Sequence, residues 1–360
     1  MRARPLLLAL PLAAVATASV GSAGCGASPP GADAVVELAG EAFGTSWHVR
    51  VPQAGGPPPE ALAMALRAEL GAVDRALSTW RDDSEIARFN AGASGAWMPV
   101  SPATAAVAAE ALEVHRRSRG AFDPTVGPLL ALWGFGPQPR NVPPSRGALQ
   151  RARARVDAAS LEVRLDPPAL RKRRPDLALE LSGIAEGHAV DALAARLAAR
   201  GVPRFLVEVG GELRGRGAGP DGRAWRVGVE RPVPGPSRVG WVVVLDDAAL
   251  ATSGTQRNRR VVDGRLRTHV LDPRRGRPVS HALRAVSVRA PRAATADAWA
   301  TALLVLGPEE GWRVARRESL AALFVTARDG ALEARATPAL APWLEARPGA
   351  GSVRVAGAGR

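Results

Sequence analysis

A single cysteine limits how this chain can be stabilised. Cys25 has no partner within the chain, so no intramolecular disulfide can form. The 360 residues must instead bury enough apolar surface, or bind ligands tightly enough, to offset the conformational entropy lost on folding. We therefore expect one compact unit, because a chain of this length has ample material for a hydrophobic core.

Residues 1–24 have the pattern of a signal peptide. Two arginines precede an apolar run over residues 6–20, which is too short to span a bilayer comfortably. Small residues come directly before Cys25, and residues 25–34 form a Pro/Gly-rich tether. We expect an exported lipoprotein whose Cys25 is lipidated, anchored at the periplasmic face of the inner membrane. The alternative is a soluble secreted protein cleaved near Ala23, and either reading takes the protein out of the cytoplasm.

The strong positive charge does not indicate a nucleic-acid-binding protein. The formal net charge is +14, but Lys172 is the sole lysine and there is no tyrosine, which points to a skewed residue usage. The arginines are scattered or lie in loops, without the interleaved aromatic residues of a single-strand binder. We expect no nucleic-acid partner, and a solvated basic face, which can also lie towards anionic lipid.

Hydrophobic periodicity over residues 35–346 predicts an α+β domain, followed by a flexible tail over 347–360. A hairpin is expected over residues 35–51, where apolar and polar residues alternate. Apolar residues at helical spacing predict helices over 60–77, 103–117, 184–199 and 295–306. Short apolar runs predict strands over 161–165, 177–181, 205–209, 225–229, 239–245 and 285–290. The fold class is a mixed, largely antiparallel sheet flanked by helices.

Asp297 and Thr301 are the most informative polar residues of the last predicted helix. They are four residues apart in an otherwise apolar stretch, so both side chains lie on one buried stripe. A buried carboxylate without a partner is costly, and a hard cation such as Mg²⁺ removes that cost by accepting carboxylate and hydroxyl oxygens. A helix cap or a satisfied polar pair is the alternative. His269, in a short β-rich run, is either a proton shuttle or a hydrogen-bonded core residue.

These segments occur together in the order of the FAD:protein FMN transferase family, the ApbE-like proteins, which this chain resembles over nearly its whole mature length. The resemblance implies a single compact ApbE-like domain related to the T-fold. The matching stretches are Gly44-Thr45, 77–80, 84–90, 120–123, 125–128, 133–136, 181–191, 209–212, Ser253-Gly254, 269–273 with Gly276, and 296–301.

The resemblance implies a role for particular residues. Asp297, Thr301 and the backbone oxygen of Gly183 are implied as Mg²⁺ ligands that hold the FAD pyrophosphate. His269 is implied beside the phosphates and, with Asp297, as a catalytic residue. The residues implied to contact FAD are Phe43, Ser78, Thr79, Trp80, Ala121, Phe122, Asp123, Glu180, Glu186 and Leu271.

The chain departs from the family pattern at five positions. Glu180 stands where the family commonly has Asp, Glu186 where many relatives have Lys, and Gln256 where a Tyr often follows the Ser-Gly. Arg275 replaces a frequent Thr, and Ala300 replaces an acid that some relatives carry before the metal-binding threonine. These changes bear on flavin orientation and on target preference more than on the metal ligands.

The implied reaction is transfer of FMN from FAD to a Ser or Thr hydroxyl of another exported or membrane protein, with release of AMP. His269 or a nearby carboxylate takes the hydroxyl proton, and the sequence does not decide between them. Two alternatives remain: an FAD pyrophosphatase that uses water as the nucleophile, and a lipoprotein that binds FAD without turnover. A purely structural envelope protein fits less well, because it would not need the glycine-rich and acidic turns together.

Overall fold

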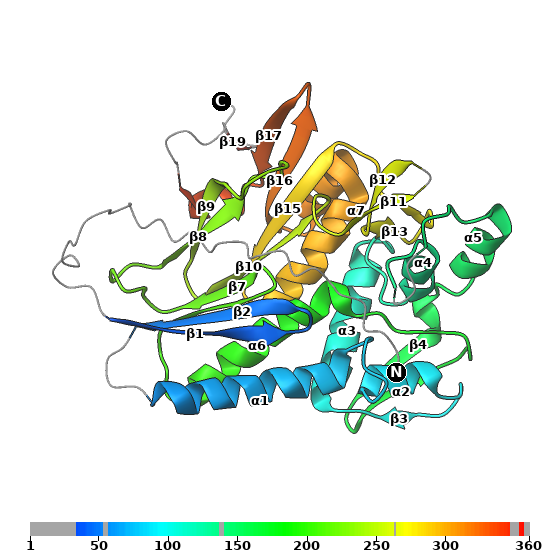
Figure 1. The fold of residues 1–360 in the computed structure, drawn as a ribbon, viewed down its shortest axis with the longest axis horizontal. Coiled ribbons are helices and arrows are strands. Elements are labelled where there is room, and N and C mark those ends of the chain that lie inside the picture. Colours follow the sequence, from blue (N-terminus) through cyan, green and yellow to red (C-terminus); the bar gives the residue numbers. More distant parts are fainter. Residues whose placement is uncertain (1–33, 53–56, 137–139, 263, 346–352, 356–360) are drawn as a thin grey trace.

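The computed structural model describes residues 34–52, 57–136, 140–262, 264–345 and 353–355 (Figure 1). The predicted signal peptide, Cys25 and nearly all of the tether therefore lie outside the described residues, as does most of the predicted tail. Within that tail, Val353–Val355 form a short strand, β19. Over the described ranges, no helix combines the length and the hydrophobicity needed to cross a membrane.

A nine-stranded sheet forms the centre of the molecule, and only its last pair of strands, β17 and β19, is parallel. The alternating and apolar runs of the sequence supply its strands, which confirms the predicted α+β class with a largely antiparallel sheet. In spatial order the strands are β1 (Val35–Ala42), β2 (Thr45–Pro52), β6 (Phe205–Val209), β7 (Glu212–Arg216), β10 (Ala248–Gly254), β15 (Leu283–Ala290), β16 (Ala321–Arg328), β17 (Ala331–Ala336) and β19.

Four small sheets surround the large one. The first comprises β18 (Leu344–Glu345), β9 (Val239–Leu245) and β8 (Trp225–Glu230), and the second β3 (Met98–Pro99), β5 (Pro168–Lys172) and β4 (Leu161–Leu165). Two are hairpins, formed by β11 (Arg259–Val262) with β12 (Arg265–Thr268), and by β13 (Leu271–Asp272) with β14 (Arg277–Pro278).

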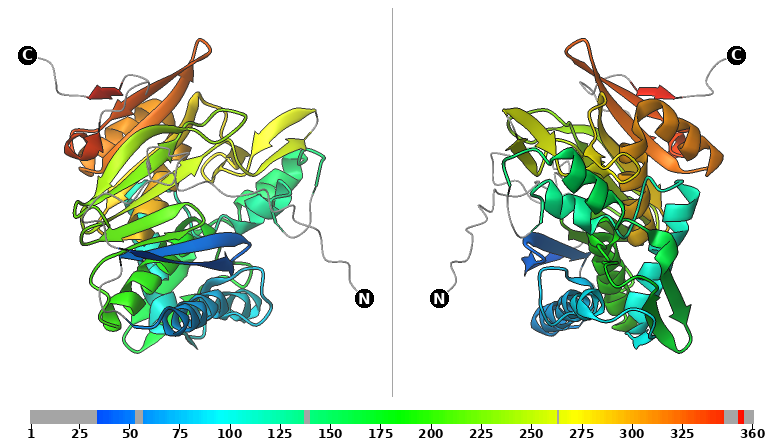
Figure 2. Two further views of the ribbon diagram at one scale, coloured as in Figure 1. Left: turned by 60° about the vertical axis from the view of Figure 1, so that its left-hand side comes forward. Right: turned by 90° about the vertical axis from the view of Figure 1, so that its right-hand side faces the viewer.

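The helices gather mainly on one side of the large sheet (Figures 1 and 2). They are α1 (Pro59–Leu77), α2 (Glu85–Ala91), α3 (Pro102–Arg117), α4 (Gly127–Leu132), α5 (Arg146–Arg153), α6 (Ser182–Ala199) and α7 (Ala293–Arg317), with two 3-10 turns at Ala158–Ser160 and Ala341–Trp343. The main core lies between the sheet and α1, α3, α6 and α7. A second core lies on the opposite face, beneath the sheet of β8 and β9. The sequence did not predict α2, α4 or α5, which are all eight residues or shorter.

The two long helices α6 and α7 approach each other closely at one glycine. A Cβ atom on Gly187 would lie 2.4 Å from the carbonyl oxygen of Ala293, so no other residue fits there without moving backbone. The nearby Asp191 side chain accepts hydrogen bonds from the N–H groups of Ala293 and Ala294, at 3.0 and 3.1 Å. The start of α7 is thereby fixed against α6, which positions the face of α7 that carries Asp297.

Helix α7 is longer than predicted. The expected break at Gly307 exists, since this residue has φ 81° and ψ −175°, and the next residue is Pro308. Helical structure nevertheless resumes and continues to Arg317. Proline is well tolerated in the first turn of a helix, so Pro308 starts the second half of α7 where the first half ends.

The predicted strand at residues 177–181 is wrong. These residues belong to no strand or helix. The side chain of Asn90 takes the place of a neighbouring strand: its Oδ1 accepts from the N–H of Leu179 at 2.7 Å, and its Nδ2 donates to the Leu179 carbonyl at 2.9 Å. The apolar alternation was read correctly, because Leu177, Leu179 and Leu181 are buried, but a side chain satisfies the backbone.

Candidate functional site

Two helices bring the three implied metal ligands together. Gly183 lies in the first turn of α6, and a Cβ atom there would be 3.6 Å from Oγ1 of Thr301 on α7. One turn later on α6 and one turn earlier on α7, the N–H of Gly187 donates to Oδ2 of Asp297 at 3.1 Å. The spacing of Asp297 and Thr301 thus places both side chains against the start of α6. Oγ of Ser253, on β10, lies 2.9 Å from Oγ1 of Thr301 and orients that hydroxyl.

Asp297 is buried with no positively charged side chain bonded to it among the described residues. Burial raises the pKa of its carboxyl well above the usual range, and the charge of Glu186 raises it further. The hydrogen bond from Gly187 acts in the opposite direction but does not cancel the burial. A carboxylate in this position is stabilised either by a proton or by a cation.

Three further acids lie beside Asp297, around the turn between β6 and β7. A Cβ atom on Gly210 would be 2.9 Å from Oε2 of Glu186 and 3.3 Å from Oε2 of Glu212, so these two carboxyls meet at the turn. Burial, together with the charges of Glu186 and Asp297, raises the pKa of Glu212 well above its usual range. Burial also raises the pKa of Glu208 to about 7. Oε1 of Glu208 accepts from the N–H of Gly211 at 2.7 Å.

Several of the implied flavin contacts form one wall of the site. Oγ1 of Thr79 donates to Oε2 of Glu180 at 3.4 Å, and the other oxygen of Glu180 accepts from the N–H of Ser182 at 3.0 Å. The N–H of Glu180 donates to the carbonyl of Pro124 at 2.7 Å, which places Glu180 beside Asp123. The segments around residues 79, 123 and 180, far apart in sequence, are therefore neighbours at the start of α6.

Asp123 is held by a histidine that the sequence did not single out. Nδ1 of His115 lies 3.2 Å from Oδ2 of Asp123 and 3.0 Å from the carbonyl of Phe122. Burial lowers the pKa of His115, but the hydrogen bond and charge of Asp123 outweigh burial and raise it overall. The other carboxylate oxygen accepts from the N–H and hydroxyl of Thr125, at 2.8 and 2.5 Å. Asp123 thus presents a fixed, saturated carboxylate rather than a mobile one.

Apolar and aromatic implied contacts line other parts of the same region. Phe122 lies 3.1 Å from the Cβ position of Gly183, directly beside the implied metal ligands, and Ala121 is buried next to it. Phe43 occupies the tight β1–β2 turn with φ 54°, and Trp80 has 66% of its surface exposed. An indole with this exposure is free to cover a ring of a bound ligand.

His269 and Leu271 lie in a neighbouring part of the site. The ring of His269 meets that of Phe135 edge to face, with 6.3 Å between centroids, and Leu271 packs with Trp133. Among the described residues, Nδ1 of His269 is buried and has no hydrogen-bond partner. Burial lowers its pKa, so the imidazole is neutral near pH 7. No hydrogen bond within the described residues links His269 to Asp297. Ser78 is not bonded to the implied metal ligands within these residues either, and its carbonyl accepts a hydrogen bond from Oγ of Ser84 at 2.5 Å.

Sequence reasoning missed His115, Glu208 and Glu212 as parts of this site. Glu212 could have been found, because it follows two glycines directly after a buried strand, a position where a side chain enters a site. His115 could not, since it lies within an amphipathic helix and meets Asp123 only through the turn at Gly120.

Comparison with known proteins places the whole arrangement in one family. A family model described as the ApbE family matches residues 43–324. The curated FAD:protein FMN transferase of Klebsiella pneumoniae (strain 342) is 40% identical over 302 residues, covering 83% of this chain and 86% of that protein. The enzyme of the same name from Escherichia coli (strain K12) is 39% identical over 295 residues, covering 81% and 84%.

Solved structures agree with the sequence comparisons. The flavin transferase ApbE from Vibrio cholerae has a TM-score of 0.79 and 34% identity, covering 86% of this chain and 99% of that one. The apo form of the flavinyl transferase ApbE from Pseudomonas stutzeri also has a TM-score of 0.79, with 38% identity over 88% of this chain and 98% of that one. The chain therefore belongs to the ApbE family.

Proposed function

We propose that this protein is a Mg²⁺-dependent FAD:protein FMN transferase, which attaches FMN through a phosphoester to a Ser or Thr of an acceptor protein and releases AMP. The observation that carries this proposal is the meeting of Asp297, Thr301 and Gly183 at the start of α6. Membership of the ApbE family and the shared name of the curated relatives support the same reaction.

The donor set fits a hard divalent cation. Asp297 offers a buried carboxylate, Thr301 a hydroxyl and Gly183 a backbone carbonyl, and these are the oxygen donors that Mg²⁺ prefers. No group of three or more His, Cys, Asp or Glu side chains able to hold a metal lies within the described residues. The proposed set contains only one such side chain, so it belongs to a different type of site. When bound, the cation would neutralise charge on the pyrophosphate of FAD.

The chain's own residues position the reactants. The first turn of α6 presents backbone N–H groups and the positive end of its dipole to an anion. Phe122, next to Gly183, excludes water from the phosphates, while Thr79 and Glu180 supply polar atoms to a ribityl or ribose hydroxyl.

The transfer itself forms one bond and breaks one. The acceptor hydroxyl oxygen attacks the phosphorus on the FMN side, the bond from that phosphorus to the bridging oxygen breaks, and AMP leaves. We assign removal of the hydroxyl proton to His269, because its buried Nδ1 is unpartnered among the described residues and its lowered pKa keeps the ring neutral. Asp297 is assigned to the cation.

The proposed location follows from the N-terminal residues. A lipid on Cys25 would hold the enzyme at the periplasmic face of the inner membrane. Exported loops of membrane electron-transport proteins and other flavinylated lipoproteins would be within reach there. This part of the proposal rests on the signal-peptide pattern and on the Pro/Gly-rich tether.

The direct test incubates the mature protein with FAD, Mg²⁺ and a purified acceptor that carries a Ser/Thr flavinylation motif. Intact mass spectrometry should show an acceptor heavier by one FMN, and AMP should appear in equal amount. Asp297→Ala, or a chelator, should abolish both products. AMP and free FMN without a modified acceptor would make the protein a pyrophosphatase, and bound but unchanged FAD would make it a storage protein.

A further inference from the structure

The residues around His269 form the most unevenly charged part of the chain. Residues 257–284 contain nine arginines but only two aspartates and no glutamate. We call this segment the arginine rim. It includes the β11–β12 hairpin, His269 and the β13–β14 turn. In Figure 2 the hairpin projects from the body of the molecule beside α4 and α5.

Most arginines of the rim form no ion pair with Asp or Glu within the described residues. Within the described residues, six rim arginines have no such ion pair, namely Arg259, Arg260, Arg265, Arg267, Arg277 and Arg284. The rim is therefore a concentration of cationic side chains that few carboxylates neutralise.

Two of these cations, Arg267 and Arg259, are partly removed from water. Nε of Arg267 is buried and has no hydrogen-bond partner among the described residues. Burial lowers the pKa of Arg259, and the like charge of Arg284 lowers it further. Unpaired guanidinium groups that have lost solvent are unfavourable, and a bound anion removes that cost.

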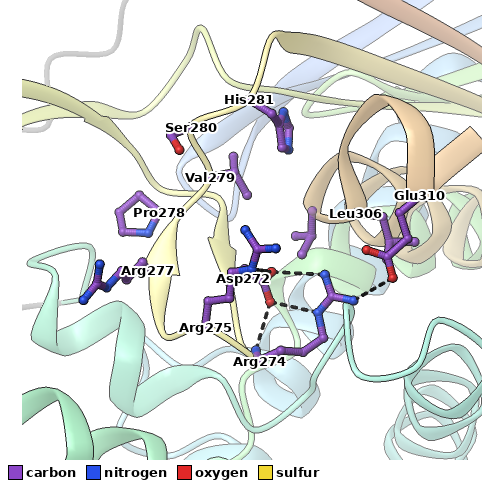
Figure 3. A pocket seen from close by; sticks show the side chains of 11 residues that line it. Asp272, Arg274, Arg275, Arg277, Pro278, Val279, Ser280, His281, Leu306 and Glu310 are labelled. Carbon is purple, nitrogen blue, oxygen red and sulfur yellow. Dashed lines mark hydrogen bonds and ion pairs between the residues drawn. The ribbon is translucent and has the colours of Figure 1, made fainter.

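The rim is fixed to the end of α4 at residues on both sides of His269 in the sequence. Nη1 of Arg260 donates to the carbonyl of Gly134, and Nε1 of the adjacent Trp133 donates to the carbonyl of Gly276, at 2.6 and 2.9 Å. The β11–β12 hairpin and the β13–β14 turn therefore both meet the end of α4. A pocket of about 360 Å³ lies at the β13–β14 turn. In Figure 3, Arg274 is paired with Asp272 and Glu310, whereas Arg277 lies apart from the other side chains drawn.

The hairpin adds an apolar patch to these charges. Val261 and Leu266 are directly opposite each other on the two strands and have 59% and 57% of their surface exposed. A nucleotide phosphate gains nothing from such a pair, whereas an extended polypeptide with acidic and apolar residues matches both features. An anionic membrane would match them as well, but it would cover the approach to His269 that an acceptor hydroxyl needs.

We propose that the arginine rim is the docking surface for an acidic segment of the acceptor protein, next to the Ser or Thr that receives FMN. The proposal rests on the proposed transferase function. Val261 and Leu266 contact apolar residues of that segment, and the unpaired guanidinium groups bind its carboxylates. The hydroxyl is thereby brought to His269.

The test compares two double charge reversals. Arg265→Glu/Arg277→Glu changes two exposed rim residues, and Arg223→Glu/Arg328→Glu makes the same charge change on the β7–β8 and β16–β17 turns. Each enzyme is assayed by intact mass spectrometry on an acceptor domain with acids beside its Ser/Thr motif, and on a copy with those acids changed to Asn or Gln. We expect the rim variant to raise the KM for the acidic acceptor about tenfold, with no change in the KM for FAD.

The remaining results separate the alternatives. The control variant should behave as the wild type, and the neutralised acceptor should be used poorly by wild type and rim variant alike. An unchanged KM in the rim variant, or an equal loss on both acceptors, overturns the proposal. If the rim variant binds phosphatidylglycerol vesicles less well but uses the acceptor normally, the rim contacts membrane instead. A wild-type protein that modifies neither acceptor refutes the transferase function itself.

Discussion

At the residue scale, the buried carboxylates of the site are each unfavourable until a proton or a ligand neutralises them. Glu186, Glu212 and Asp297 are neighbours, and burial together with the charge of Glu186 disfavours ionisation of Glu212 and Asp297. Such a cluster lowers the stability of the free protein at neutral pH, and perturbed carboxyl groups of this kind are typical of functional sites. The consequences can be measured without any knowledge of the acceptor.

Asp297→Asn should stabilise the free protein and remove its response to Mg²⁺. The folded-state pKa of Asp297 is raised above the unfolded value, so the native state holds a proton that the unfolded chain has lost. Stability therefore falls as pH rises through that window, and the amide removes this penalty. Wild type with FAD should gain about 2.7 kcal/mol when Mg²⁺ is present at 100 times its Kd, and the variant should gain none. Calorimetric melts with and without Mg²⁺ check this, and an equal shift in both proteins would contradict the metal assignment.

Glu208→Gln should flatten the pH dependence of stability. Glu208 has a pKa of about 7 in the folded protein, against 4.5 for an ordinary glutamate, because of burial. At a pH between these two pKa values, the native state binds a proton that the unfolded chain has lost. The free energy of unfolding therefore falls as pH rises through this window, by about 3 kcal/mol in total. Gln keeps an oxygen for the N–H of Gly211 but does not ionise. Urea unfolding at pH 5 and pH 8 should show that the free energy of unfolding falls less with pH in the variant than in the wild type. An equal fall in both proteins would show that Glu208 is not the titrating group.

The sequence identifies single residues well when the chemistry lies within one element. Asp297 and Thr301 are separated by one helical turn, and their shared face follows from helix geometry alone. The pairing of His115 with Asp123 depends on how the chain turns at Gly120, with φ 77°, and no local pattern contains that information. The cluster of Glu186 with Glu212 depends on two elements meeting in space, so it also required the structure.

At the element scale, the crossing of α6 and α7 sets the geometry of the proposed metal ligands. These helices touch at Gly187, whose own N–H holds Asp297. A change at this crossing should therefore act on both stability and activity.

Gly187→Ala should destabilise the protein and reduce FMN transfer. The added methyl group would lie 2.4 Å from a backbone oxygen, which cannot rotate away, so the helices must separate. We expect a loss of about 1–3 kcal/mol by urea unfolding, typical of overpacking, and a rise in the Mg²⁺ concentration needed for activity. The matched control is Gly71→Ala in the middle of α1, where only the flexible end of Arg75 is near. The control should gain about 0.5–1 kcal/mol from helix propensity. Similar stability of the two variants would contradict the close crossing.

Element prediction succeeded for long amphipathic helices and buried strands, and failed where side chains replace regular pairing. Helix α1 and strand β6 follow the predicted ranges closely, since their apolar residues repeat with one clear period. Residues 177–181 have the same alternation as a strand, but Asn90 supplies their hydrogen bonds. The sole lysine contributes as well: Nζ of Lys172 donates to the carbonyls of Asn90 and Leu177, at 2.8 and 3.3 Å. Such side-chain bridges join distant segments, and periodicity does not detect them.

At the scale of the whole molecule, the large sheet separates two hydrophobic cores, and only one of them adjoins the proposed site. The helical side carries α6 and α7 and hence the proposed metal site, while the side beneath β8 and β9 is an apolar layer. The α+β class was predictable because helical and alternating periods occupy separate stretches of the sequence. The order of the nine strands was not, because β2 pairs with β6 and β10 with β15 across long intervening segments.

The final prediction concerns membrane association of the full-length protein and of its Cys25→Ser variant. If Cys25 carries the lipid, wild type should sediment with membranes and dissolve only in detergent, and the variant should appear in the soluble periplasmic fraction. Its transfer of FMN to a soluble acceptor domain should not change, because the folded domain is untouched. Transfer to an acceptor embedded in vesicles should fall, since tethering raises the effective concentration of enzyme at the membrane. Ala27→Ser in the same tether is the control and should remain with the membrane. Solubility of the wild type would instead indicate a secreted protein, cleaved by an ordinary signal peptidase.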